Sequence, residues 1–184
     1  MAVLRKPFLL IVGLFAATAL GGTGSPSSAA QSAKPAVHPK TSIDEVVDAV
    51  STCVTATGAE YVNLDTLAKG GWKITEVFGN PAELAINNYN RPGSNADIMI
   101  IKLAKNPGSY QCSAIGRFPN EASFAELDRR VETLLGRGPD DKSSATADDG
   151  SRTETFSWRL SHKAVTFAHF YGRSSVMITM RYVE

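Results

Sequence analysis

Histidine and cysteine have the widest chemistry of the side chains in this sequence, which holds three histidines and two cysteines. His38 precedes the first regular pattern, His162 falls in an expected turn and His169 lies on an expected strand. A metal site needs His, Cys, Asp or Glu side chains whose spacing lets them converge, and these histidines lack such spacing. We therefore expect no metal and no other cofactor. His169 either shares a site with Tyr171 and Tyr182, or ends an apolar face and hydrogen-bonds a carbonyl group or water.

Other catalytic patterns are missing as well. The acidic pairs at 140–141 and 148–149 lack the alternating oxygen ligands of a calcium loop, so we expect a solvated loop there. The sequence contains neither a nucleophile elbow nor a glycine-rich phosphate-binding motif. We therefore expect a non-enzymatic protein. The alternative is a small secreted hydrolase in which His169 works with a nearby carboxylate.

Three residues in or beside an asparagine-rich segment are candidates for binding. Trp72, Tyr89 and Arg91 combine aromatic rings with a guanidinium group, and these residue types are enriched at binding hot spots. The alternative is structural, with Trp72 covering the core and Tyr89 closing a loop. Together with His169, these residues form the predicted binding set, and we expect its ligand to be a protein or a small molecule.

Residues 1–30 have the composition of a cleavable secretion signal. Arg5 and Lys6 supply its cationic start, and residues 8–20 form an apolar run shorter than the about 20 residues that span a bilayer. Small residues near Ala30 suit a signal peptidase, so we expect cleavage after it. The protein is then periplasmic or secreted, without stable insertion in a membrane.

The remaining chain has the size of one domain. Residues 31–41 contain two prolines and no apolar period, so we expect a flexible leader, and residues 42–184 form the domain. The chain has a formal charge of +1, and two positive charges lie in the signal, which leaves −1 on the rest. A nearly neutral domain lacks the concentrated basic surface that nucleic acid requires, so we expect no nucleic-acid partner.

Both cysteines, Cys53 and Cys112, lie after the expected cleavage site. In an oxidising compartment two cysteines of a small domain most simply form a disulfide. The alternative is a pair of buried free thiols.

Apolar periodicity and turn residues predict the secondary structure. A capping box at Ser42 and Glu45 starts a helix that ends at Gly58 with Cys53 on its buried side. A second capping box, at Ser123 with Glu126, starts a helix that ends at Gly136, and residues 63–69 suggest a short helical turn. Alternation predicts strands at 72–78, 96–104, 110–118, 155–160, 163–171 and 175–183.

These elements predict an α+β domain with the order α-βββ-α-βββ. About six antiparallel strands form one sheet or two three-stranded sheets, with both main helices packed on one face. A helix followed by a meander, used twice, resembles the element order of the bacterial β-lactamase inhibitory proteins. The resemblance concerns element order alone, and a fold does not determine a function.

Overall fold

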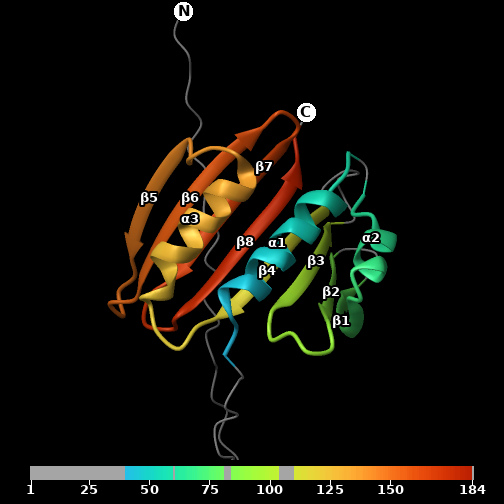
Figure 1. Cartoon of the computed structure of the whole chain (residues 1–184), viewed down its shortest axis with the longest axis horizontal. Coiled ribbons are helices and arrows are strands. Elements are labelled where there is room, and N and C mark those ends of the chain that lie inside the picture. Colours follow the sequence, from blue (N-terminus) through green and yellow to red (C-terminus); the bar gives the residue numbers. More distant parts are fainter. Residues whose placement is uncertain (1–39, 60, 81–83, 104–109, 184) are drawn as a thin grey trace, which may run out of the picture. The chain divides into compact units, whose positions relative to one another are not determined.

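The computed structural model describes residues 40–59, 61–80, 84–103 and 110–183 (Figure 1). The predicted signal peptide and nearly all of the predicted leader lie outside these residues. The helices are α1 (Ile43–Ala56), α2 (Leu64–Lys69) and α3 (Ser123–Leu135). The strands are β1 (Lys73–Asn80), β2 (Leu84–Asn90), β3 (Asp97–Leu103), β4 (Tyr110–Arg117), β5 (Asp141–Thr146), β6 (Arg152–Leu160), β7 (Lys163–Phe170) and β8 (Ser175–Tyr182).

The strands form one antiparallel sheet with the order β1-β2-β3-β4-β8-β7-β6-β5. Each half of the chain supplies a four-stranded meander, and the halves join where β4 pairs with β8. The predicted α+β class and antiparallel pairing are confirmed. The strand number and the element order differ from the prediction, because the sheet has eight strands and each helical segment is followed by four.

The two additional strands explain this difference. Strand β2 contains Asn87, Asn88 and Asn90, which favour loops, but it is hydrogen-bonded to β1 on one side and β3 on the other. Pairing on both sides outweighs the weak intrinsic preference of these residues. Strand β5 is an edge strand whose six residues are all exposed, so it has no buried face to produce apolar alternation.

The predicted helix starts have different outcomes. At α1 the capping box is present: Ser42 Oγ accepts from the Glu45 backbone N–H at 3.2 Å, and Glu45 Oε2 accepts from the Ser42 N–H at 2.6 Å. The second box is wrong, because Ala122 is the N-cap of α3 and no side chain caps this helix. Ser123 is already the first helical residue, one position too late to act as the cap.

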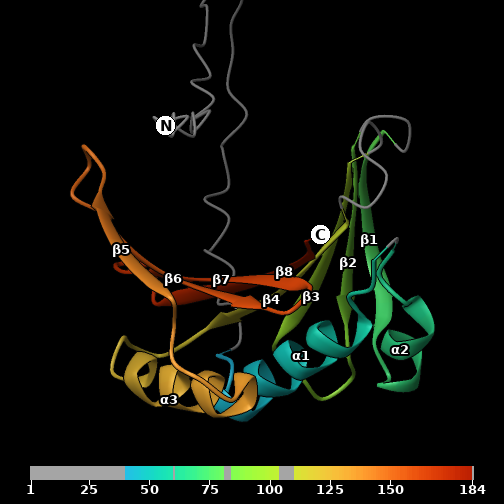
Figure 2. The same ribbon diagram turned by 90° about the horizontal axis from the view of Figure 1, so that it is seen from above.

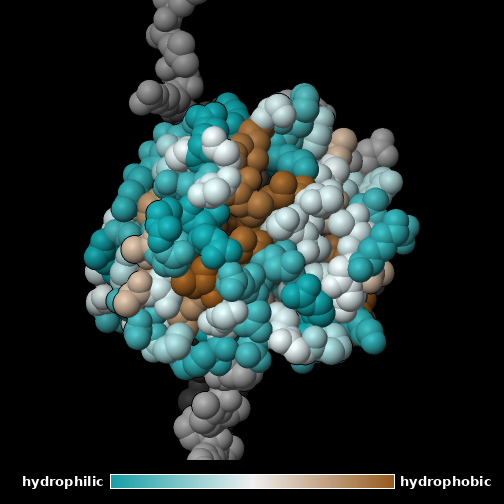
Figure 3. Space-filling view, viewed as in Figure 1, coloured by the Kyte–Doolittle hydropathy of each residue, from teal (hydrophilic) through white to brown (hydrophobic). Residues whose placement is uncertain are grey.

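The two long helices lie on the same face of the sheet, as predicted. Figure 2 shows that the sheet curves, with its edge strands rising away from the helices. We call the side covered by α1 and α3 the helix face and the other side the concave face. The core fills the helix face, where the sheet contributes buried side chains such as Ile98, Ala114, Phe156, Phe167 and Ile178. Apolar surface on this side gathers between the two helices (Figure 3).

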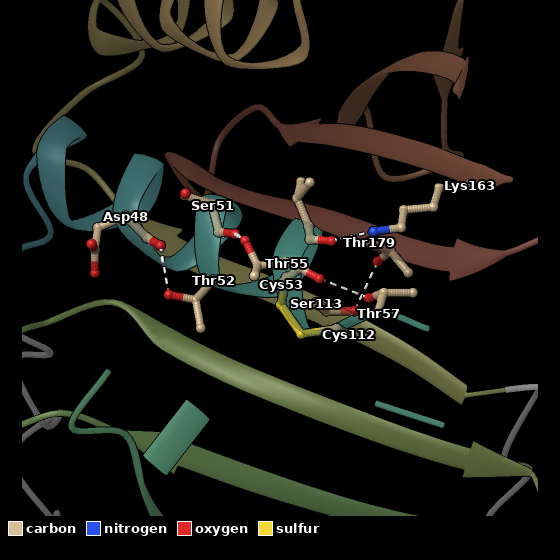
Figure 4. Close-up of a disulfide and its surroundings, with 11 residues drawn as sticks. Asp48, Ser51, Thr52, Cys53, Thr55, Thr57, Cys112, Ser113, Lys163 and Thr179 are labelled. Atoms are coloured by element: carbon tan, nitrogen blue, oxygen red, sulfur yellow. Dashed lines mark hydrogen bonds between the residues drawn. A yellow bond between two sulfur atoms is a disulfide. The ribbon is translucent and has the colours of Figure 1, made fainter. Parts of the chain in front are cut away.

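The predicted disulfide between Cys53 and Cys112 is confirmed and ties α1 to β4 (Figure 4). Both cysteines are fully buried, and their Cα atoms are 5.4 Å apart. The helix approaches β4 closely, because a Cβ atom at Gly116 would lie 2.4 Å from the Val46 side chain. The glycine therefore lets α1 lie against the strand.

The domain begins slightly earlier than predicted. Thr41, the last residue of the predicted leader, is buried and donates its backbone N–H to Arg117 O at 2.7 Å. Its hydroxyl also donates to Asn95 O at 3.0 Å. Thr41 thus belongs to the fold, although its position before the capping box predicted a flexible residue.

Candidate binding site

The structure brings two of the predicted binding residues together beside α1. The Arg91 guanidinium carbon lies 5.1 Å from the centre of the Trp72 ring, and Arg91 Nη1 lies 2.7 Å from Asp48 Oδ2 on the helix. Trp72 is 2% exposed and Tyr89 is 6% exposed. Burial raises the pKa of Tyr89, although a hydrogen bond with Asn87 partly opposes this. Both rings therefore contribute to the core, and a binding role for these residues stays a prediction.

His169 lies in the other half of the molecule, inside an aromatic cluster. It is 1% exposed, and its ring stacks on Phe124 with 4.4 Å between ring centres. Its Nε2 lies 2.8 Å from Asp128 Oδ1 on α3, although the geometry of the two groups does not make a hydrogen bond. Tyr171 lies 6.2 Å from the His169 ring, whereas Tyr182 stacks on His162 instead. The structure thus assembles only part of the predicted trio. The polar group beside the His169 ring is a carboxylate, as the hydrolase alternative expected, and not the carbonyl group or water of the structural alternative.

A second polar cluster adjoins His169 on the helix face and surrounds Glu154. Tyr171 donates its hydroxyl to Glu154 Oε2 at 2.8 Å, Arg152 pairs with Oε1, and Lys142 Nζ lies 3.8 Å from Oε2. The Tyr171 hydrogen bond, opposed by burial and aided by the two cations, holds the pKa of Glu154 below its ordinary value. Burial and the same hydrogen bond raise the pKa of Tyr171 to about 12. These groups satisfy one another, so the cluster stabilises the β5–β7 region.

The concave face carries side chains in rows, because directly paired residues of neighbouring strands point to the same side. We call one of these rows, which crosses the sheet from β6 to β1, the arginine row. In spatial order it contains Arg159, Ala164, Arg181, Gln111, Ile101, Ile86 and Phe78. Its two cations lie at one end and its apolar side chains at the other.

A cavity of about 660 Å³ lies at the cationic end of this row. This volume is within the range of about 300–1,000 Å³ that is usual for small-molecule sites. Its described lining contains three arginines, Arg137, Arg159 and Arg181, and one acid, Asp140. Positive charge therefore predominates in the cavity.

Asp140 is engaged within the cavity wall. Its Oδ1 pairs with the Arg137 guanidinium group, and its Oδ2 accepts the backbone N–H of Arg159 at 2.6 Å. The Asp140 carboxylate therefore balances Arg137. By contrast, the Arg159 and Arg181 side chains form no ion pair with any residue that the structure describes.

A row of hydroxyl groups lies beside the arginine row. Ser157, Thr166, Thr179 and Ser113 are paired in succession across β6, β7, β8 and β4. Ser157 and Thr166 also line the cavity, and the Ser113 and Thr179 hydroxyl oxygens are 2.9 Å apart (Figure 4). Hydroxyl groups donate and accept hydrogen bonds, so this row adds neutral polar contacts next to the cations.

Sequence reasoning did not single out the arginines of this cavity. The alternation that places Trp158 and Met180 inward also places Arg159 and Arg181 outward, so their face was predictable. That Arg159 and Arg181 lie close together was not predictable, because it depends on the pairing of β7 with both β6 and β8 around Ala164.

In residues 40–183, apart from the gaps named above, no three His, Cys, Asp or Glu side chains are placed to hold a metal ion. The helices within these ranges are too short or too polar to cross a membrane. No family model, curated protein or solved structure matches the chain. The comparisons therefore give no support to the predicted likeness to the β-lactamase inhibitory proteins, and the element order on which that likeness was based differs from the observed one.

Proposed function

We propose that this protein is an exported, non-enzymatic binding domain that holds a protein or small ligand on the concave face. One observation carries the proposal: the cavity on this face contains two arginines without an ion-pair partner among the described residues. The predicted signal peptide supports export. The disulfide is consistent with an oxidising compartment, the periplasm or the cell exterior.

Binding accounts for these features better than hydrolysis does. A hydrolase built on His169 requires an accessible base that can reach both a nucleophile and the substrate. Asp128 supplies a carboxylate, but the His169 ring is enclosed by Phe124, Phe156 and Phe167. This arrangement resembles a packed core more than a substrate cleft.

The experiment compares matched substitutions on the two faces. Thr166→Trp places a bulky, uncharged side chain at an exposed position of the concave face, and Thr133→Trp does the same on exposed α3. The purified protein and both variants are immobilised and mixed with an extract of the cell envelope. We expect the wild type and Thr133→Trp to retain the same ligand and Thr166→Trp to lose it, because the new ring fills part of the cavity.

Equal retention by Thr166→Trp would show that the ligand binds elsewhere. Failure of the wild type to retain a ligand, together with measurable hydrolytic turnover, would reverse the choice between binding and catalysis.

A further inference from the structure

The strand pairing around Ala164 places two arginine side chains in the lining of one cavity. Arg159 and Arg181 are both direct cross-strand partners of Ala164, one on each side. Strands lie about 4.8 Å apart, so the Cα atoms of the two arginines are roughly 10 Å from each other. The methyl group between them leaves space that forms part of the cavity. Long arginine side chains can bridge such a space and contact one group from both sides.

The positive charge of the cavity favours an anionic ligand. Two cations face the same cavity, and the only acid in its described lining is paired with Arg137. Arginine presents a planar set of donors that matches the oxygens of carboxylate and phosphate. An anion between Arg159 and Arg181 relieves their mutual repulsion and satisfies donors from both.

The chemistry of the row changes on the far side of Arg181. Gln111 follows, and the next three positions are Ile101, Ile86 and Phe78. The two isoleucines are partly exposed and Phe78 is 51% exposed. An inorganic ion would contact the arginines alone, whereas a ligand with an anionic head and an apolar body matches the whole row.

We propose that the arginine row binds an organic anion, with its carboxylate or phosphate head between Arg159 and Arg181 and its apolar body extending past Gln111 to Ile101. This inference rests on the proposed function, because it names the chemistry of the ligand on the same face. The head and the body make separate contributions, and each has its own test.

The first experiment varies head and body independently. Isothermal titration compares acetate, decanoate, decyl phosphate and decanol as probes. Each buried CH₂ group adds up to about fourfold in affinity, so we expect decanoate or decyl phosphate to bind at least about tenfold more tightly than acetate. The charged head should give a similar advantage of about tenfold over decanol. The stronger of the two charged probes identifies the head group.

The second experiment assigns the site. Arg159→Gln and Arg181→Gln should each weaken binding of the charged decyl probe by about tenfold or more, without changing the weak binding of decanol. Ile101→Ser should weaken binding of the decyl probe and leave acetate unchanged. Arg130→Gln is the matched control, because Arg130 lies on α3 and pairs with Asp44 on the helix face.

Several results would overturn the inference. These are failure of both charged decyl probes to bind, equal affinity for acetate or decanol, or unchanged affinity in the Arg159 and Arg181 variants. The envelope experiment separates this failure from failure of the proposed function. If Arg159→Gln and Arg181→Gln keep the natural ligand and Thr166→Trp loses it, the concave face binds a ligand but the organic-anion inference is wrong.

Discussion

Removal of the disulfide should lower the free energy of unfolding substantially, and the structure sets the size of the effect. Cys53 and Cys112 are 59 residues apart, so their bond closes a loop of 60 residues. In the chain-entropy account, opening this loop adds about 14 cal/mol/K to the entropy of the unfolded chain, or about 4 kcal/mol at 25 °C. Domains are stable by about 5–15 kcal/mol, so this loss is a large part of the total.

The assay is equilibrium urea denaturation of the Cys53→Ala/Cys112→Ala variant and of wild-type protein in its oxidised and reduced forms. Reduced wild type keeps both sulfur atoms in the core, so it isolates the effect of the loop from the loss of packing. We expect its unfolding free energy to fall by about 4 kcal/mol. We expect the double variant to lose somewhat more, because both cysteines are fully buried.

A loss below about 1 kcal/mol in the reduced protein would refute this reasoning. It would mean that the unfolded chain is already compact enough for the bond to restrict it little.

Three further substitutions test local parts of the structure, each by urea denaturation. Gly116→Ala should destabilise the fold by about 1–3 kcal/mol, because the new methyl group meets Val46, and Val46→Ala in the same chain should recover part of the loss. Glu154→Gln should cost about 1.5–3 kcal/mol at neutral pH by weakening hydrogen bonds to a charged group. Because the pKa of Glu154 is lowered in the fold, its contribution is complete above the ordinary value of 4.5 and is lost as the pH falls below it. Tyr171→Phe should lower the free energy of unfolding at neutral pH and remove its dependence on pH in the alkaline range. In the wild type the contribution from the raised pKa of Tyr171 is complete below the ordinary value of 10 and is lost as the pH rises to about 12.

Each of these expectations has a contrary outcome. An unchanged free energy of unfolding in Gly116→Ala would mean that α1 can shift away from β4 without loss of stability. A wild type and a Glu154→Gln variant with parallel stability profiles in acid would show that this carboxylate does not couple folding to pH. If the stability of wild type and of Tyr171→Phe changes equally with pH in the alkaline range, the Tyr171 hydroxyl does not couple folding to pH.

Local patterns were sufficient where one interaction defines an element. The capping box at Ser42 located the start of α1, and the helical period placed Cys53 on the buried side of that helix. Strict alternation predicted the last three strands, and apolar residues at alternate positions of these strands, including Phe167 and Ile178, are fully buried. In each case the signal lies within a few neighbouring residues, so it can be read without knowledge of the fold.

Tertiary pairing decided what local patterns did not. The asparagines of β2 favour a loop in isolation, and only their position between two strands makes them extended. The exposed edge strand β5 has no buried face to detect. The candidate site needs the registers of three strands at once, because Arg159 and Arg181 become neighbours only through Ala164.

The pairing of β4 with β8 has a consequence for how the chain folds. The last of the eight strands in chain order occupies a central position, and it hydrogen-bonds to β4 and β7. Until β8 is in place, the first meander ends in a bare strand with unpaired backbone groups, and so does the second. Such edges invite pairing with other chains, so a protein shortened before Ser175 should aggregate instead of losing only one strand. The sheet is therefore complete only when β8, the last strand in chain order, has paired with β4 and β7.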